Sequence, residues 1–225
     1  MFKKLLVKAR DAQWLWDMFG PIYNRQIYNA IFELYEHISL NIDVDTDSQI
    51  LDVGTGRGYM ALQLASHIPM TSVVGIDFSP TQIRAAERLR KKRRVGNCRY
   101  QLGNAMEIPF REDHFDAVVS VGSIKHWPNP QKGVSEMRRV LAPGGWAVIS
   151  ETDKEVSDET LRQFMARFKA GYLWNPLLFW GLRHIIFGES YSHQEIVAFF
   201  KAAGFKNIHM RNLGTCPYVI VKAQK

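Results

Sequence analysis

The sequence predicts an α/β fold: a doubly wound, mostly parallel seven-stranded sheet with an antiparallel last strand, N-terminal helices and a helical lid inserted after the fifth strand. Three observations predict it. Short apolar runs alternate with helical patterns from Gln49 to Glu151, the first run leads straight into closely spaced glycines, and two final runs flank a Leu213-Gly214 turn. Strands separated by helices pair in parallel, whereas strands joined by a short turn pair antiparallel.

The N-terminal part of the chain predicts helices and then the first strand. Apolar residues in Leu15–Leu40 recur every three or four positions, which is typical of a helix, and Gly20-Pro21 divides that helix in two. The apolar run Gln49–Val53 ends in glycines and predicts a buried strand. The next helix is expected over Tyr59–Ile68, where Pro69 closes it.

The second strand is expected over Ser72–Asp77, and a clear helix start follows it. Ser79 is a capping residue, Pro80 occupies the first turn without losing a needed donor, and Gln82 stands three positions after the cap. This helix runs into the basic stretch 88–94, which has six arginines and lysines.

Three further strands complete the parallel part of the sheet. They are expected over Cys98–Leu102, Phe115–Val121 and Trp146–Glu151. A helix over Pro130–Leu141 separates the last two, and Pro143-Gly144-Gly145 ends it. The repeated alternation of strand and helix predicts helices on both faces of the sheet.

The pattern changes after Glu151. Apolar residues from Leu161 to Phe168 predict one helix, and the aromatic stretch Tyr172–Phe187 is expected to add another. Ser192 and Glu195 form a capping box before a third helix, and Gly204 follows that helix. The closing strands are expected over Asn207–Asn212 and Cys216–Lys222.

Composition and charge set limits on function. Hydrophobic residues make up 46% and charged residues 23% of the 225 residues, an ordinary mixture for one globular domain. The N-terminus lacks the continuous apolar run of a signal peptide, and Tyr172–Gly188 is too polar to span a membrane, so we expect a cytoplasmic protein without a transmembrane segment. Cys98 and Cys216 match no metal spacing, and no metal site is predicted.

The net charge of +7 owes much to the basic stretch 88–94. Such a stretch can bind nucleic acid or an anionic membrane. It is more often the solvated C-terminal end of a helix, where cations also suit the helix dipole. We favour the solvated end and keep nucleic-acid binding open.

The glycine-rich stretch Leu51–Gly58 is the strongest local signal. Glycines let the backbone approach a ligand closely, and the helix start behind them offers unpaired amide donors. The dinucleotide fingerprint needs glycine or alanine where Tyr59 stands, which argues against a nicotinamide dehydrogenase. Asp77, about twenty residues beyond the loop, can accept both hydroxyls of a ribose, although it could also be a loop-forming aspartate.

Five motifs in order carry a family resemblance: LDVGTGRG, VVGIDFSP, GNAMEIPF, FDAVVSVGSIKHW and MRRVLAPGGW. The chain resembles class I S-adenosylmethionine-dependent methyltransferases, and most closely the group (methyltransferase domain 11 type) that contains the ubiquinone and menaquinone biosynthesis methyltransferases. The resemblance covers Gln49–Ser150. It implies a Rossmann-like methyltransferase fold, S-adenosylmethionine as cofactor and S-adenosylhomocysteine as product.

The resemblance also implies a division of one domain, 1–225. An N-terminal helical cap (1–45) would precede a cofactor-binding core (46–152), a helical lid or substrate region (153–204) and the closing strands (205–225).

The expected cofactor residues follow from the same resemblance. Asp52 and the glycines would surround the methionine half, Asp77 would bind the ribose, and Phe78 would lie against the adenine. Many relatives carry aspartate where this chain has Asn104, whose carbonyl oxygen can still accept a hydrogen bond but without the charge. The whole expected set is Asp52, Gly54, Thr55, Gly56, Gly58, Asp77, Phe78, Gln82, Asn104, Ala105, Ser120 and Val121.

Residues after the fourth strand are expected to line the path to the acceptor. His126 could act as a general base or orient a hydroxyl, and it could equally be a packed loop histidine. Tyr23, Lys125 and Trp127 are the expected acceptor-binding residues. An activated cofactor lets such an enzyme act by aligning its partners and excluding water, so no strong catalytic constellation is required.

The acceptor is the least determined part of the function. No proline-proline-aromatic motif follows the fourth strand, and neither cysteine has the setting that covalent pyrimidine methylation needs. We expect in-line methyl transfer to a small, apolar or aromatic acceptor. The alternatives are an RNA or protein methyltransferase that uses the basic stretch 88–94, and a non-catalytic S-adenosylmethionine-binding module. The oligomeric state stays open.

Overall fold

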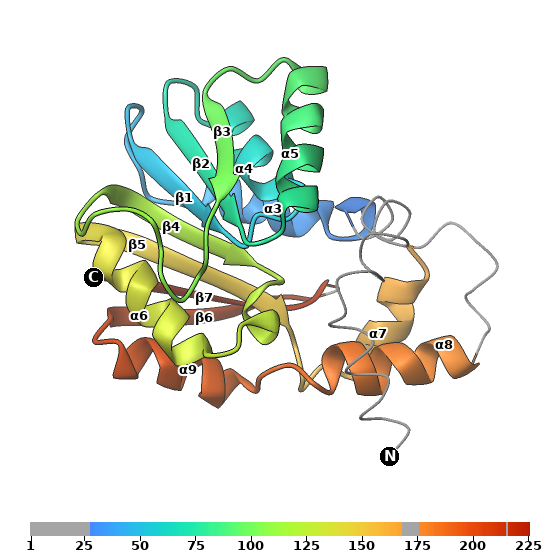
Figure 1. Ribbon diagram of the computed structural model, residues 1–225. Coiled ribbons are helices and arrows are strands. Elements are labelled where there is room, and N and C mark those ends of the chain that lie inside the picture. The colour runs from blue at the N-terminus through green and yellow to red at the C-terminus, as the bar shows by residue number, and fades with distance from the viewer. Residues whose placement is uncertain (1–27, 168–175, 215) are drawn as a thin grey trace.

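The computed structural model describes residues 28–167, 176–214 and 216–225, and a seven-stranded sheet is its central feature (Figure 1). The strand order is β3-β2-β1-β4-β5-β7-β6. Parallel pairs join β1 through β5, and β7 runs antiparallel to both β5 and β6, so the predicted sheet is confirmed. The strands are β1 Gln49–Val53, β2 Ser72–Asp77, β3 Cys98–Leu102, β4 Phe115–Val121, β5 Leu141–Thr152, β6 Lys206–Leu213 and β7 Cys216–Gln224.

Helices cover both faces of the sheet, as the alternation predicts (Figure 1). The described helices are α3 Phe32–Leu40, α4 Tyr59–His67, α5 Pro80–Arg93, the short 3₁₀ turn η1 Ile124–His126, α6 Pro130–Val140, α7 Asp158–Met165, α8 Pro176–Gly181, the π-helical turn η3 Leu182–Phe187 and α9 His193–Ala202. The predicted helix pieces before residue 28, and residues 168–175 of the lid, lie outside the described residues.

The central strands are buried on both faces, which explains their continuous apolar sequences. One core cluster joins Ile50 of β1 to α3 and α4, and the other joins Leu51 of β1 to α6 and α9. Successive side chains of a strand point to opposite faces, so neighbouring residues of β1 serve the two layers. The sheet ends therefore stay fixed, and the loops beyond them can carry function.

The predicted helix caps form as expected. The Ser79 hydroxyl accepts a hydrogen bond from the Gln82 amide at 3.4 Å, with Pro80 in the first turn. Both arms of the Ser192 capping box are present, since Ser192 accepts from the Glu195 amide at 3.2 Å and Glu195 accepts from the Ser192 amide at 2.7 Å.

The start of β5 differs from the prediction. The strand begins at Leu141 and not at Trp146, because Leu141 takes an extended backbone (φ −77°, ψ 134°) and pairs with Phe115. The helix before it accordingly ends at Val140, one residue earlier than expected. Pro143-Gly144-Gly145 therefore lies inside an irregular strand, where the register with β4 shifts.

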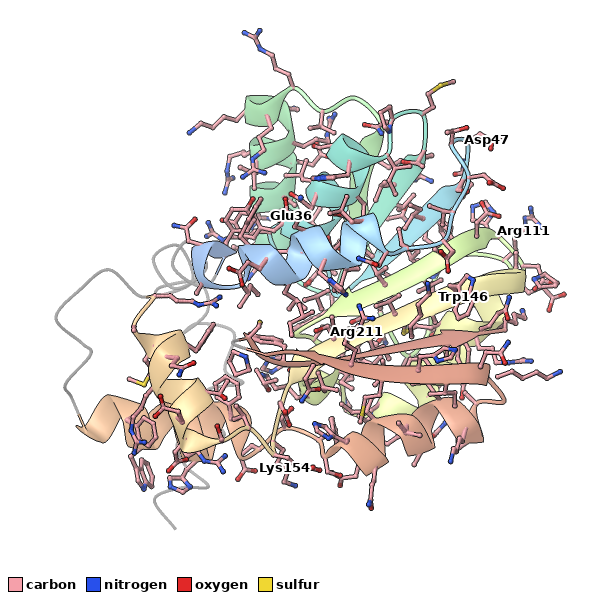
Figure 2. All side chains as sticks on the ribbon, turned by 180° about the vertical axis from the view of Figure 1, so that it is seen from behind. Glu36, Asp47, Arg111, Trp146, Lys154 and Arg211 are labelled. Atoms are coloured by element: carbon pink, nitrogen blue, oxygen red, sulfur yellow. The ribbon has the colours of Figure 1, made fainter. Side chains whose placement is uncertain are left out.

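The insertion after β5 lies beside the sheet and not on one of its faces (Figure 1). Lys154 marks where the chain leaves β5 (Figure 2). Arg183 of η3 pairs with Asp158 at the start of α7, with Nε and Oδ1 3.0 Å apart, so the described parts of the insertion are joined to each other. No helix among the described residues is both long enough and apolar enough to cross a membrane.

The sheet face toward α3 carries Trp146 on β5 and Arg211 on β6 (Figure 2). Arg211 Nη1 lies 3.3 Å from His37 Nε2 on α3, and Lys222 Nζ lies 4.4 Å from the centre of the Trp146 ring. Polar and cation–π contacts thus cover part of this face, on the antiparallel side of the sheet.

Candidate active site

The glycine loop between β1 and α4 lies at the carboxyl edge of the sheet. The amides of Gly54 and Thr55 both donate to the Ile76 carbonyl of β2, each at 2.9 Å. Gly54, Gly56 and Gly58 all have positive φ (72°, 53° and 79°), which favours glycine over residues with a Cβ atom. In open sheets of this kind, ligands bind at this edge.

The three glycines have different surroundings. A Cβ atom on Gly54 would lie 1.9 Å from Ser123 Oγ, and one on Gly58 would lie 2.3 Å from the Tyr100 hydroxyl oxygen. The Tyr100 hydroxyl donates to the Gly58 carbonyl at 2.9 Å. A Cβ atom on Gly56 would meet no described residue within 4 Å. The loop is therefore packed at both ends and open at its centre.

Asp77 ties the end of β2 to the open part of the loop. Its Oδ2 accepts from the Gly56 amide and its Oδ1 accepts from the Ser79 amide, both at 2.9 Å. Burial raises the pKa of Asp77, while these two amides and the charge of His126 act to lower it. Each carboxylate oxygen can accept a second hydrogen bond, so the group can also receive hydroxyls of a ligand.

Asp52 lies beneath the loop and is buried. Its Oδ2 accepts a 2.6 Å hydrogen bond from the Thr55 hydroxyl. Burial raises the pKa of Asp52 to about 7, although the Thr55 hydroxyl and the Ala61 amide act to lower it. The two residues join the end of β1 to the loop from inside.

Two exposed apolar side chains stand at neighbouring strand ends. Phe78 is 72% exposed and Leu102 is 53% exposed, and Leu102 pairs with Asp77 across β2 and β3. Ligand-binding sites are commonly lined by apolar side chains with a few polar groups among them. Sequence reasoning missed Leu102, although the position of the residue as the last of a predicted strand at this edge could have indicated it.

The expected adenine-edge residues follow β3. Asn104 is exposed, and its Oδ1 accepts from the Met106 amide at 3.0 Å, so one of its two acceptor positions serves its own loop. Ala105 is half-buried. Gln82 is half-buried in the first turn of α5, where its amide donates to the cap.

The end of β4 supplies Ser120 and Val121. Ser120 is fully buried, and its Oγ has no hydrogen-bond partner among the described residues. Val121 is half-buried and packs against the cluster on the α3 side. Arg57, inside the glycine loop, has a buried Nε that likewise has no hydrogen-bond partner in the described part of the chain. Sequence reasoning did not single out Arg57.

The turn after β4 packs against the glycine loop. Trp127 Nε1 donates to Ser123 Oγ at 2.9 Å, which is the oxygen that faces Gly54. The Trp127 ring is buried and lies so close to α6 that a Cβ atom on Gly133 would be 2.4 Å from it. Trp127 thus fills the space between the loop and α6.

Lys125 forms a buried ion pair with Glu151 at the end of β5. Nζ and Oε1 are 3.2 Å apart, and the side chains are 7% and 0% exposed. Glu151 also accepts from the amides of Lys125 (3.3 Å) and Thr152 (2.7 Å). Burial alone would raise the pKa of Glu151, but the Lys125 charge and these hydrogen bonds outweigh it and lower that pKa. Glu151 was not anticipated, although a charge ending an apolar strand could have indicated it.

His126 acts electrostatically on both Asp77 and Glu151. In its protonated form the imidazole lowers the pKa of both carboxyl groups, so it is within electrostatic range of each. Its amide donates to the Ser123 carbonyl at 3.0 Å, which fixes the turn. Tyr23, the remaining expected acceptor residue, lies outside the described residues.

The basic stretch 88–94 lies away from this edge of the sheet, and the two cysteines are not reactive thiols. α5 begins at the carboxyl end of β2 and ends before β3 starts, so the basic stretch 88–94 points to the opposite edge of the sheet. Burial raises the pKa of Cys98 to about 11 and that of Cys216 to about 12, so both thiols stay protonated at neutral pH. No group of three or more metal-ligating side chains occurs in the described part of the chain.

A family model described as a methyltransferase domain matches residues 51–149. The spinach 2-methyl-6-phytyl-1,4-hydroquinone methyltransferase is 32% identical over 165 residues, 73% of this chain and 41% of the relative. The ubiquinone/menaquinone biosynthesis C-methyltransferase UbiE of Geotalea daltonii is 32% identical over 66% of each chain. The Lactiplantibacillus plantarum demethylmenaquinone methyltransferase is 26% identical over 89% of this chain and 90% of its own.

The chain spans about two fifths of the length of the plant relatives. Among solved structures, an S-adenosylmethionine-dependent methyltransferase from Aquifex aeolicus covers 97% of this chain and 96% of its own, with a TM-score of 0.63 and 19% identity. The [4+2]-cyclase SpnF covers 86% and 80%, with a TM-score of 0.68 and 19% identity. These structures share the fold, and the second shows that the fold alone does not determine the reaction.

Proposed function

Because the chain belongs to the S-adenosylmethionine-dependent methyltransferases, we propose that it transfers a methyl group from that cofactor to a small aromatic acceptor of the hydroquinone class. The names of the similar proteins support this class, since they act on a phytyl hydroquinone or in ubiquinone and menaquinone biosynthesis. Methyl transfer to ring carbon is the corresponding reaction. Residence in the cytoplasm stays a prediction.

One observation carries the cofactor assignment: the loop is open at Gly56, and the Gly56 amide is held by Asp77. A ligand that approaches the backbone there meets a carboxylate with spare acceptor positions. Phe78 and Leu102 would receive the adenine on the same side, with Asn104 and Ala105 at its edge. The Arg57 Nε, without a partner among the described residues, is a donor that a carboxylate-bearing ligand would satisfy.

These residues fit S-adenosylmethionine, which combines a ribose, an adenine and an amino-acid carboxylate. When bound, the cofactor supplies a methyl group already activated on a sulfonium sulfur. The chain's own residues have to hold and orient it and exclude water. Asp77 would hold the ribose hydroxyls, and Asp52 with Thr55 would keep the loop in place. Gly54, Gly58, Gln82, Ser120 and Val121 would shape the surrounding walls.

The acceptor would lie beyond the glycine loop, at the ends of β4 and β5. His126 is the group there that can take a proton from an acceptor hydroxyl at an imidazole nitrogen, and it lies within electrostatic range of Asp77. Trp127 would act indirectly, by holding Ser123 against Gly54. Tyr23 stays an expected acceptor residue.

The direct test is transfer of a labelled methyl group. Purified protein is incubated with methyl-tritiated S-adenosylmethionine and a panel of alkylated 1,4-hydroquinones, and the organic extract is counted. Label in the hydroquinone fraction, absent without protein, is the expected result. Label in added RNA or protein instead would support the alternative acceptors. Binding of the cofactor without transfer to any acceptor would indicate a non-catalytic module.

A further inference from the structure

We propose that Lys125 is the acceptor-binding residue that holds a hydroxyl oxygen of the acceptor as an anion, and that Glu151 is the positioning residue that keeps Lys125 in place. This inference rests on the proposed function and adds to it the charge state in which the acceptor is bound. It predicts acceptors with an acidic hydroxyl, such as phenols and hydroquinols, over uncharged ring compounds without one.

The first support is the location of Lys125. The turn that carries it starts at Gly122, whose amide donates to the Ser150 carbonyl of β5 at 2.7 Å, and it packs through Ser123 against Gly54 of the glycine loop. Lys125 is the neighbour of His126 in this turn. It therefore lies at the same sheet edge as the glycine loop but beyond the next strand, β4, where an acceptor is expected.

The second support is the hydrogen-bonding capacity of the ammonium group. A lysine has three N–H donors. In the part of the chain that the structure describes, Nζ has two partners, Glu151 Oε1 at 3.2 Å and Thr152 Oγ1 at 3.0 Å. The third donor is left for a ligand. The Lys125 side chain is 7% exposed and that of Glu151 is fully buried, so of the two only the lysine has exposed side-chain surface at this edge.

The third support is the burial of the ion pair. Buried ion pairs contribute little to stability compared with apolar residues of similar size, so their presence at a ligand-binding edge indicates a different use. Glu151 has four donors or cations around it, namely the Lys125 amide and ammonium, and the Thr152 amide and hydroxyl. A carboxylate so well supplied stays ionised and is a poor base, but it fixes both the backbone and the side chain of Lys125.

Lys125 and His126 have different roles at the proposed oxygen site. The acceptor O–H bond breaks, the proton goes to an imidazole nitrogen of His126, and the electron pair stays on the oxygen beside Lys125 Nζ. In a phenolate, resonance shares this pair with the ring carbons ortho and para to the oxygen, which makes those carbons nucleophilic. Low solvent exposure strengthens the attraction between the ammonium and the anion.

The test uses 4-nitrophenol, whose phenolate absorbs visible light and whose neutral form does not. The protein is saturated with S-adenosylhomocysteine and titrated with the phenol over a range of pH. We expect the bound phenol to have an apparent pKa lower by about one unit, since a cation within a few ångströms lowers the pKa of an acid. Binding should favour the coloured anion.

Variants assign the effect to the ion pair. Lys125→Met alone would leave Glu151 charged and unpaired, so the informative variant is the double substitution Lys125→Met with Glu151→Gln. It should retain S-adenosylhomocysteine binding, lose the pKa shift and bind the phenol at least about tenfold more weakly. The single substitution Lys125→Arg keeps a cation beside Glu151 and should retain part of the pKa shift. Lys132→Met, an exposed lysine on α6, should behave like the wild type.

Three results would overturn the inference while leaving the proposed function standing. The first is binding of the phenol in its neutral form, and the second is no binding of the phenol by the S-adenosylhomocysteine complex at any pH. The third is a shift in the phenol's pKa that survives in the double variant. Failure of the wild type to bind S-adenosylhomocysteine would overturn the inference and the proposed function together.

Discussion

At the scale of single residues, the site consists of polar groups that each hold a neighbour and still have capacity for a ligand. Asp77 receives the amides of Gly56 and Ser79 while two acceptor positions remain. Lys125 binds Glu151 and Thr152 with one donor remaining among the described contacts. Such groups are positioned before a ligand arrives, which lowers the free energy needed to order the site.

Replacing Asp77 tests the cofactor assignment. Asp77→Ala removes charge-assisted hydrogen bonds of about 1.5–3 kcal/mol each and also releases the Gly56 amide. We expect the affinity for S-adenosylmethionine to fall at least about tenfold, measured by calorimetric titration. Asp47→Ala, in the exposed turn before β1 on the opposite edge, is the matched control (Figure 2). An Asp77→Ala protein with wild-type affinity would refute the assigned role.

Asp52 predicts a particular pH dependence of stability. Burial raises its pKa from 3.8 to about 7. Between these values the folded protein keeps a proton that the unfolded chain has released, so the contribution of this group is full below pH 3.8 and is lost as the pH rises through about 7. Asp52→Asn removes this loss.

Urea unfolding of both proteins at several pH values measures the difference. The free energy of unfolding of the wild type, relative to Asp52→Asn, should decline as the pH rises across that window and then level off. A difference that is independent of pH, or one that grows in favour of the wild type, would show that Asp52 is ionised in the folded protein.

At the scale of elements, the glycine loop contains a structural glycine, Gly58, and a ligand-facing one, Gly56. An alanine at Gly56 meets open space among the described residues and adds only the backbone strain of positive φ, about 1–2 kcal/mol. An alanine at Gly58 adds a clash with Tyr100. We expect Gly56→Ala to stay folded but to bind S-adenosylmethionine weakly, and Gly58→Ala to be the less stable protein in urea. Normal cofactor affinity in Gly56→Ala would contradict the proposed approach of the ligand.

The elements also indicate what the sequence alone could predict. The limits of β1 to β4 agree with the structure because β1, β2 and β4 are short, mainly apolar runs between polar or glycine residues, and because apolar residues alternate with Arg99 and Gln101 in β3. The early start of β5 could not be predicted, since Pro143-Gly144-Gly145 is typical of a turn and only pairing with Phe115 makes the segment extended. Tertiary pairing outweighed local preference there.

The candidate site likewise contains residues that the sequence could identify and residues that only the structure reveals. The glycine loop and Asp77 form a recognisable spacing along the chain, so the sequence is sufficient to identify both as candidates. Glu151 and Leu102 matter through neighbours distant in sequence, namely Lys125 and Asp77, and such pairs form only where the strands are adjacent. The exposure of Phe78 and the burial of Trp127 likewise depend on the assembled layers.

At the scale of the whole molecule, the basic stretch 88–94 and the candidate active site lie toward opposite edges of the sheet. The net charge of +7 includes the basic stretch 88–94, which lies toward the edge opposite the glycine loop. Within it, Arg93 lies over the Tyr28 ring at 5.4 Å and Arg90 pairs with Glu87. These two arginines have structural partners. The division of the chain at residues 46, 153 and 205 stays a prediction.

Neutralising three exposed members of the basic stretch tests the small-molecule assignment. The triple variant Arg88→Gln, Lys91→Gln and Lys92→Gln leaves Arg90, Arg93 and Arg94 in place. We expect cofactor affinity and methyl transfer to a hydroquinone to match the wild type, measured side by side in the label assay. Salt-sensitive RNA binding by the wild type that the variant loses would favour a nucleic-acid acceptor instead.

The most direct measurement of the central claim is calorimetric titration of the purified wild-type protein with S-adenosylmethionine and, separately, with S-adenosylhomocysteine. The structure of the glycine loop, Asp77 and the exposed Phe78 predicts saturable binding of both at micromolar concentration. Absence of binding to either compound would contradict the account, because the open centre of the loop at Gly56 would then serve a different ligand.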